Sequence, residues 1–191
     1  WIDTSGAGGT NGDMAFDAAG NLYLVGSATT TTVYSVTAAS LAGGSGGELA
    51  ASESFSSALN NFSAINGMAF NTTGAMYLGN GTTVRQYDSS TWTQIGSNVT
   101  GSLSSSTDLA SCNSPATLTL AKNVTGRVYP NDQFRLSIHS GDTESGYAVT
   151  TGTATGVQAE QVGPLPVIQG TTYRVSEAMA SGSTGTTADY T

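Results

Sequence analysis

The chain has 191 residues, of which only 9% are charged, and a formal net charge of −8 at pH 7. This balance excludes a nucleic-acid partner, because binding a phosphate backbone needs clustered Lys and Arg, and the sequence holds only five such residues. No apolar run approaches the roughly 20 residues that span a bilayer, so we expect no membrane span in this segment. Abundant Gly, Ser and Thr without long helical periodicity predict an all-β protein of two units.

The first half contains an internal repeat. Identical residues recur at one offset of 54 residues, among them Met14 and Met68, Phe16 and Phe70, Gly20 and Gly74, and Tyr23 and Tyr77. Each copy predicts a hairpin, with a turn at residues 17–20 or 71–74 in which Gly adopts positive φ. A Thr-rich strand is expected after each hairpin, at residues 31–36 and 82–87.

A repeat of about 40 to 50 residues built from four short strands is typical of a β-propeller blade. The pattern Met-Ala-Phe-Asp/Asn-x-x-Gly-x-x-Tyr-Leu resembles blades of propellers in extracellular bacterial proteins. We therefore interpret residues 1–103 as about two β-propeller-like blades. Because a ring takes 4 to 8 blades, this propeller is incomplete. Either further blades precede Trp1, the first residue of what we expect to be a piece of a longer polypeptide, or the open edges pair with another chain.

Three features of this half have alternative interpretations. The Gly-rich stretch 43–47 predicts an exposed loop within residues 39–57. Trp92 is expected in the outer strand of the second blade, as a packed aromatic in preference to a sugar-stacking one. Asp13, Asp17 and Asn21 carry the oxygen atoms that calcium prefers, but turn chemistry explains Asp17 and Asn21 equally well. We expect no metal and no cofactor.

Residues 104–112 are interpreted as a linker that ends at the only cysteine, Cys112. An unpaired cysteine in an extracellular protein suggests a disulfide with a residue outside the chain. The alternative is a small apolar residue that packs.

Residues 113–191 predict a β-sandwich, because short strands alternate with turn signals. The expected strands are 116–124, 133–139, 147–154, 157–167 and 171–178. In the second of them Arg135 and His139 share the face opposite the apolar residues. His139 is therefore expected on the solvent side, and no Ser or Cys stands in a triad context around it.

Lys122, the only lysine, shares its strand face with Leu118, Leu120 and Val124. Glu177 shares a face with Tyr173 and Val175 in the last expected strand. An ammonium and a carboxylate in one apolar layer cost several kcal/mol each in desolvation unless they pair closely or react. Burial also favours the neutral amine and the protonated acid, which are the reactive forms. The alternatives are an ordinary ion pair at the rim or a lysine that extends to solvent.

The Lys-terminated strand 118–122, the Phe-containing strand 132–136 and the segment 170–177 resemble the prealbumin-like (transthyretin-like, collagen-adhesin B-type) domains of Gram-positive and actinobacterial surface proteins. The resemblance covers residues 113–191. It implies a spontaneous isopeptide bond from Lys122 to an Asn or Asp of the last strand, with Glu177 as proton shuttle. The sequence departs from the family at the acceptor. The domain is interpreted as truncated at its last strand, and Asp189, the only later acidic residue, lies in the expected loop.

These inferences favour a non-enzymatic extracellular surface, adhesin or stalk module at the cell wall, stapled by the isopeptide bond. Its partners would be other copies or parts of the same surface protein, or an environmental or host glycan or protein. One alternative is a subunit of an extracellular filament completed by strand addition. Another is a glycan-binding or glycan-active propeller, although the acidic residues are scattered and not paired as in glycosidases.

Overall fold

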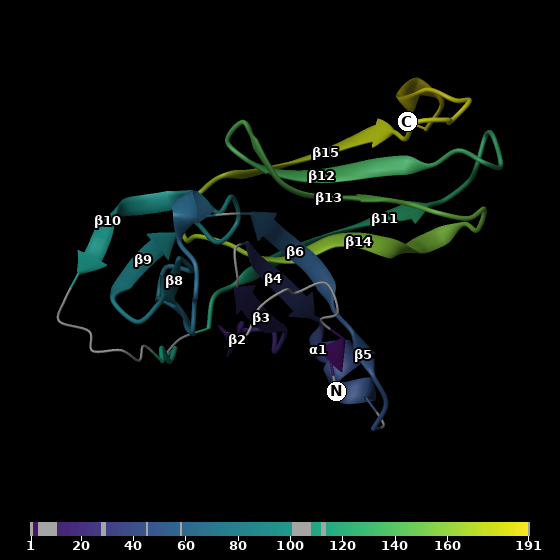
Figure 1. The fold of residues 1–191 in the computed structure, drawn as a ribbon. Coiled ribbons are helices and arrows are strands. Elements are labelled where there is room, and N and C mark those ends of the chain that lie inside the picture. Colours follow the sequence, from purple (N-terminus) through teal and green to yellow (C-terminus); the bar gives the residue numbers. More distant parts are fainter. Residues whose placement is uncertain are drawn as a thin grey trace. The chain divides into compact units, whose positions relative to one another are not determined.

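The chain forms two units, each built of β-strands (Figure 1). Unit 1 comprises residues 1–117 and 166–169, and unit 2 comprises residues 118–165 and 170–191. The computed structural model describes residues 2–3, 11–27, 30–44, 46–57, 59–100, 108–111 and 114–190. Within these residues, no helix has both the length and the apolar character needed to cross a membrane.

Two four-stranded sheets make up most of unit 1, and each runs through its strands in antiparallel order. The first sheet has the order β2 (Asn11–Phe16), β3 (Leu22–Ser27), β4 (Thr31–Val36) and β6 (Ser52–Ser57). The second has the order β7 (Gly67–Phe70), β8 (Met76–Gly79), β9 (Thr83–Tyr87) and β10 (Gln94–Thr100). Smaller elements are β1 (Ile2–Asp3), which pairs in parallel with β5 (Leu49–Ala50), the helix α1 (Ala38–Gly43) and the 3-10 turn η1 (Leu59–Asn61).

The two predicted hairpin turns are confirmed, and their hydrogen bonds are equivalent. Oδ1 of Asp17 accepts from the backbone N–H of Ala19 and Asn21 at 2.8 and 2.9 Å. Oδ1 of Asn71 accepts from the backbone N–H of Thr73 and Ala75, each at 2.9 Å. Both turns end in a glycine at positive φ, 82° for Gly20 and 92° for Gly74. The repeat therefore preserves a side-chain-capped turn, because an Asx oxygen and a glycine at fixed spacing suffice to build it.

The exposed loop expected at 43–47 is found at Gly44, Gly46 and Gly47, which are exposed and lie outside helices and strands, but an unexpected helix precedes it, and the strand expected at Trp92 is wrong. Residues 38–43 form a helix, whose first turn is capped by Oγ1 of Thr37 accepting from the N–H of Ser40 at 3.1 Å. Trp92 lies in a turn before β10 and not in a strand, with φ of 60° and its N–H bonded to the carbonyl of Asp88 at 2.8 Å. Its side chain packs against the core of unit 1, as the packed-aromatic interpretation expected.

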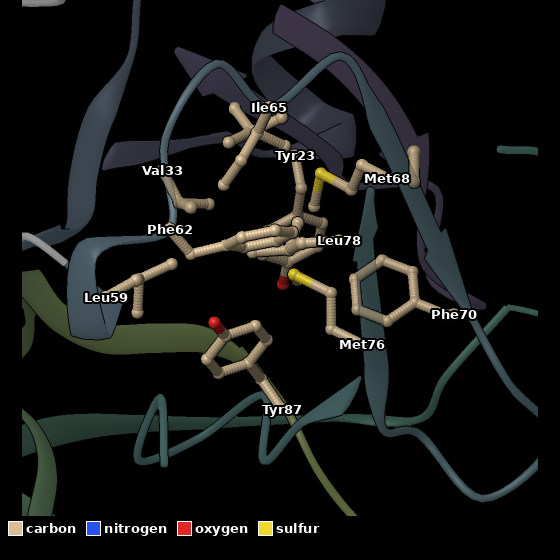
Figure 2. Packing of buried hydrophobic residues seen from close by; sticks show 12 residues of the cluster. Tyr23, Val33, Leu59, Phe62, Ile65, Met68, Phe70, Met76, Leu78 and Tyr87 are labelled. Carbon is tan, nitrogen blue, oxygen red and sulfur yellow. The ribbon is translucent and has the colours of Figure 1, made fainter. Parts of the chain in front are cut away.

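The core of unit 1 lies between the two sheets and is closed by the segment that connects them (Figure 2). The first sheet contributes Ala15, Tyr23, Val25 and Val33, and the second contributes Met68, Phe70, Met76, Leu78 and Tyr87. Leu59, Phe62 and Ile65 from the connecting segment complete it. Tyr23 and Phe70 meet edge to face, with ring centroids 5.7 Å apart and planes at 76°.

Unit 2 contains a three-stranded and a two-stranded sheet. The first has the order β13 (Thr143–Val149), β12 (Phe134–Ser140) and β15 (Tyr173–Met179); the second joins β11 (Thr117–Val124) and β14 (Gly156–Pro166). The 3-10 turn η2 (Thr187–Tyr190) ends the described chain. Leu136, Ile138, Val162 and Leu165 form the core, with Leu118, Leu120, Ala148 and Tyr173 packed against it.

Four of the five strands expected in unit 2 agree with the structure to within two residues. The third begins at Thr143 and ends at Val149, earlier than the expected 147–154. The reason is a tight turn in which Gly141 has φ of 58°, so pairing with β12 resumes at Thr143. After the strand ends, the N–H of Thr150 donates to the carbonyl of Phe134 in β12 at 2.9 Å.

Candidate functional site

Lys122 of β11 and Glu177 of β15 face each other within unit 2. The lysine Nζ lies 2.8 Å from each carboxylate oxygen of Glu177. The backbone geometry explains the meeting, since Leu118 and Leu120 on the face of Lys122 pack on the core. Glu177 pairs with buried Leu136 in the ladder between β15 and β12, and paired residues share a face. Both charged groups therefore point to the interior side of their sheets.

The pair is nevertheless not sealed in an apolar layer, which corrects the expectation of deep burial. The side chain of Lys122 is 17% exposed and that of Glu177 is 36% exposed. A contact of this openness is an ion pair at the rim of the sandwich, where solvent competes for both charges.

The openness has a structural cause at one edge of the sandwich. In the described part of the chain β11 pairs only with β14, so its second edge carries no strand. On the opposing sheet Val175 pairs with Ile138 and shares its inward face, yet Val175 is 54% exposed while Ile138 is fully buried. An inward valine is left open when no strand of the facing sheet lies over it. Val175 and the Lys122–Glu177 pair therefore lie on edge strands, since β15 is also the last strand of its own sheet in the described structure.

The ring of Phe134 contacts the ammonium group of Lys122. Nζ of Lys122 lies 4.6 Å from the ring centroid of Phe134, which is fully buried at the start of β12. A cation over an aromatic face is held by the ring quadrupole. Tyr190 meets the same ring edge to face at 4.9 Å, and the guanidinium of Arg127 lies 5.9 Å from it. Lys122 is thus held both by a carboxylate and by a buried ring.

Asp132 fixes the loop that follows β15, a role that the sequence analysis missed. Its carboxylate is buried and accepts from the backbone N–H of Thr184 and Gly185 and from the hydroxyl of Tyr190, at 2.7 to 3.2 Å. Burial by itself would raise the pKa of Asp132, but the N–H groups of Gly185 and Thr184, the Tyr190 phenol and the Arg127 guanidinium outweigh it and hold the pKa below its usual value. The only signal in the sequence was a turn motif at 130–132, because the partners lie some fifty residues away.

The remaining predicted residues do not join this site. Asp189 caps its own turn, where Oδ2 accepts from the N–H of Thr186 at 2.7 Å. Cys112 lies outside the described residues. In unit 1, Oδ2 of Asp13 accepts from the N–H of Met68 at 2.6 Å, and Asp17 and Asn21 are bonded to each other within their turn. No group of three or more His, Cys, Asp or Glu that could hold a metal ion occurs among the residues described.

His139 lies on the outer face of the three-stranded sheet, half-buried, and its Nε2 is 3.0 Å from Oγ of Ser176. Its Nδ1 has no hydrogen-bond partner within the described structure. The nearby carboxylate of Glu144 is bound by Arg135 at 2.7 and 2.8 Å. Without an acceptor on Nδ1, the ring is not oriented as in a Ser-His-acid triad.

Comparison with known proteins bears on unit 2. Residues 117–191 match the family model of a prealbumin-like fold domain of the SpaA type, which confirms the resemblance for this part of the chain. Domains of this type are typical of surface and pilus proteins of Gram-positive bacteria. No curated protein and no solved structure matches the chain significantly.

Proposed function

We propose that this chain is a non-enzymatic structural module of an extracellular surface protein of a Gram-positive-type bacterium. The observation that carries the proposal is the match of residues 117–191 to a domain type typical of such proteins. The low charge and the abundance of Gly, Ser and Thr are consistent with an exposed β-rich segment. In this proposal the two sheets of unit 1 are blades of a β-propeller-type repeat, and unit 2 is a stalk or adhesin domain.

Location is tested by brief protease treatment of intact cells of the source organism. We expect peptides from this chain among those released, together with those of known wall proteins and without cytoplasmic ones. Recovery of the chain only after lysis would contradict the proposal.

Within this function, Lys122 is proposed to form an amide crosslink with an Asn or Asp on a strand added beside β11. The open edge, the exposed inward Val175 and the bidentate contact with Glu177 support this placement. The amine nitrogen attacks the side-chain carbonyl carbon, the new C–N bond forms, and ammonia leaves from Asn or water from Asp. Glu177 takes the proton from the amine and passes it to the leaving group.

The crosslink is tested by fusing an additional strand after residue 191 through a Gly/Ser linker, with apolar residues at alternate positions. One Asn is moved through successive inward positions of this strand. In the register that brings Asn opposite Lys122, the intact mass is expected to fall by about 17 Da, the mass of ammonia. Lys122→Arg and Glu177→Gln are the matched controls and should keep the full mass.

A second readout uses the single lysine of the sequence. Acetylation under denaturing conditions should modify the N-terminus and Lys122 in the unlinked protein, but only the N-terminus after crosslinking. A full mass and a reactive Lys122 at every Asn position would remove the crosslink and leave the surface location standing.

The same open edge favours a second candidate, a filament subunit whose added strand comes from a neighbouring chain. Strand addition provides backbone hydrogen bonds along an unpaired edge without new side-chain chemistry. Sedimentation at increasing protein concentration separates the two. A filament subunit forms assemblies through β11 that a proline within this strand prevents, because proline removes an edge N–H, whereas association through other surfaces persists in the proline variant.

A further inference from the structure

The two sheets of unit 1 pack through two different faces of the same repeat. We call one face of each sheet the tyrosine face, and in the first sheet it carries Ala15, Tyr23, Val25 and Val33. The opposite face of each sheet is the methionine face, and in the second sheet it carries Met68, Phe70, Met76 and Leu78. The core forms where the first sheet's tyrosine face meets the second sheet's methionine face (Figure 2). Such an interface is heterologous, so each sheet retains one face for a further neighbour.

The methionine face of the first sheet is open where its equivalent is closed. Met14 is 59% and Phe16 is 48% exposed, whereas Met68 and Phe70 at the same repeat positions are 0% and 3% exposed. The side chains of Met14 and Phe16 line a pocket together with Leu109 and Ala110, and both side chains remain in contact with solvent. The same residue types are thus buried in one copy and open in the other, and the difference is the presence of a neighbouring sheet.

The tyrosine face of the second sheet is open along its outer strand, β10, whereas Ala69 on the same face is 8% exposed and Tyr77 is half-buried. Ile95 pairs with Gln86, and Gln86 pairs with Tyr77, so the three share this face. Val99 joins it through its pairing with Val84. Ile95 is 39% and Val99 is 53% exposed. The part of this face that a further sheet could cover is therefore its outer strand together with the half-exposed side of Tyr77.

We propose that the methionine face of the first sheet binds the tyrosine face of a further four-stranded sheet of the same repeat. The internal repeat identifies this occupant, since an equivalent sheet already covers Met68 and Phe70. In the new interface Phe16 takes the position of Phe70 and meets a tyrosine equivalent to Tyr23. In a solution of this chain the occupant is a second copy, which presents Tyr77, and copies add head to tail. The proposal concerns unit 1 alone and does not depend on the crosslink or on the surface location.

Directed disulfide formation tests this geometry in the full chain, with Cys112 first replaced by Ser. Phe16→Cys and Tyr77→Cys proteins are mixed and mildly oxidised. We expect a mixed dimer several-fold above the yield of a control mixture of Phe16→Cys with Val157→Cys, whose side chain lies in unit 2 and is 73% exposed. Tryptophan fluorescence confirms that each variant keeps the fold of unit 1.

Two results would overturn the proposal. One is a yield of the 16–77 dimer no higher than that of the control pair. The other is a 16–16 dimer as abundant as the 16–77 dimer, which would indicate a symmetric contact in place of head-to-tail stacking. As an independent measurement, the sedimentation coefficient should rise with concentration for the Cys112→Ser protein. Adding Phe16→Ser should abolish the rise and adding Val157→Ser should leave it.

Discussion

Replacing Phe70 by alanine should destabilise unit 1 far more than the same change at Phe16, its equivalent in the repeat. Phe70 is 3% exposed and its ring packs edge to face on Tyr23 at 5.7 Å. Removing a buried phenylalanine costs about 3–5 kcal/mol, because transfer free energy is lost and a cavity remains. The loss of the aromatic pair, about 0.5–1.5 kcal/mol, is contained in that range.

The cost at Phe16 follows from its exposure. Full burial of a phenylalanine side chain contributes about 1.5–3 kcal/mol, and Phe16 is 48% exposed, so about 1 kcal/mol is at stake. No closed cavity forms at an open position, because water occupies the vacated space. The expected difference between the two substitutions is therefore about 2–4 kcal/mol.

The assay is urea unfolding followed by tryptophan fluorescence at low protein concentration. Both tryptophans belong to unit 1, so the signal reports on this unit even if unit 2 unfolds separately. Equal losses of unfolding free energy at the two positions would refute the reasoning, because they would mean that Phe16 is already covered in the monomer. If copies stack, the cost of Phe16→Ala should grow with protein concentration while that of Phe70→Ala stays constant.

Four further substitutions test individual interactions. Asp17→Ala should destabilise unit 1 by about 2–3 kcal/mol in the same assay, because it leaves buried donors unpaired, whereas Asn71→Asp keeps the turn acceptor and should cost less than about 1 kcal/mol. The pKa of Asp132 is lower in the folded state than in the unfolded state, so its carboxylate stabilises the fold at pH values above the unfolded pKa of about 4. This stabilisation is lost as the pH falls through the pKa of the folded state. Asp132→Asn should accordingly flatten the acid side of the pH dependence of unit 2 unfolding, followed by circular dichroism, and an unchanged slope would contradict the assignment. Arg135→Gln breaks the exposed contact with Glu144 and should change the unfolding free energy by less than about 1 kcal/mol, so a larger loss would show that the pair is coupled to more than its own charges.

The turns and strand positions could be predicted because their determinants are local. An Asx residue followed three positions later by glycine builds the turns at Asp17 and Asn71 from a few consecutive residues. In unit 2, alternation with period two placed Lys122 and Glu177 on interior faces without any knowledge of strand order. These signals depend on the backbone of one segment at a time.

The failures arose where tertiary structure decided. A Gly-, Ala- and Ser-rich stretch gave no helical pattern, yet residues 38–43 form a helix whose first N–H, that of Ala38, donates to Oδ1 of Asn21 in the hairpin turn at 2.9 Å. Trp92 adopts a positive φ that its residue type disfavours, because the turn at Asp88 and the packing of its ring compensate. The openness of Glu177 depends on which strands lie opposite β15, and periodicity within one strand carries no such information.

The two proposed associations involve different kinds of neighbour. In unit 2, Val175 is exposed and the second edge of β11 pairs with no strand of the described residues, so the proposed neighbour is a strand bound by main-chain hydrogen bonds. In unit 1, Met14 and Phe16 are exposed on a sheet face, so the proposed neighbour is a layer bound by side-chain packing. A proline in β11 should therefore block the first association and not the second, while Phe16→Ser should do the reverse. If either substitution blocked both associations, the two units would share one interface, and the separation of strand addition from sheet stacking would be wrong.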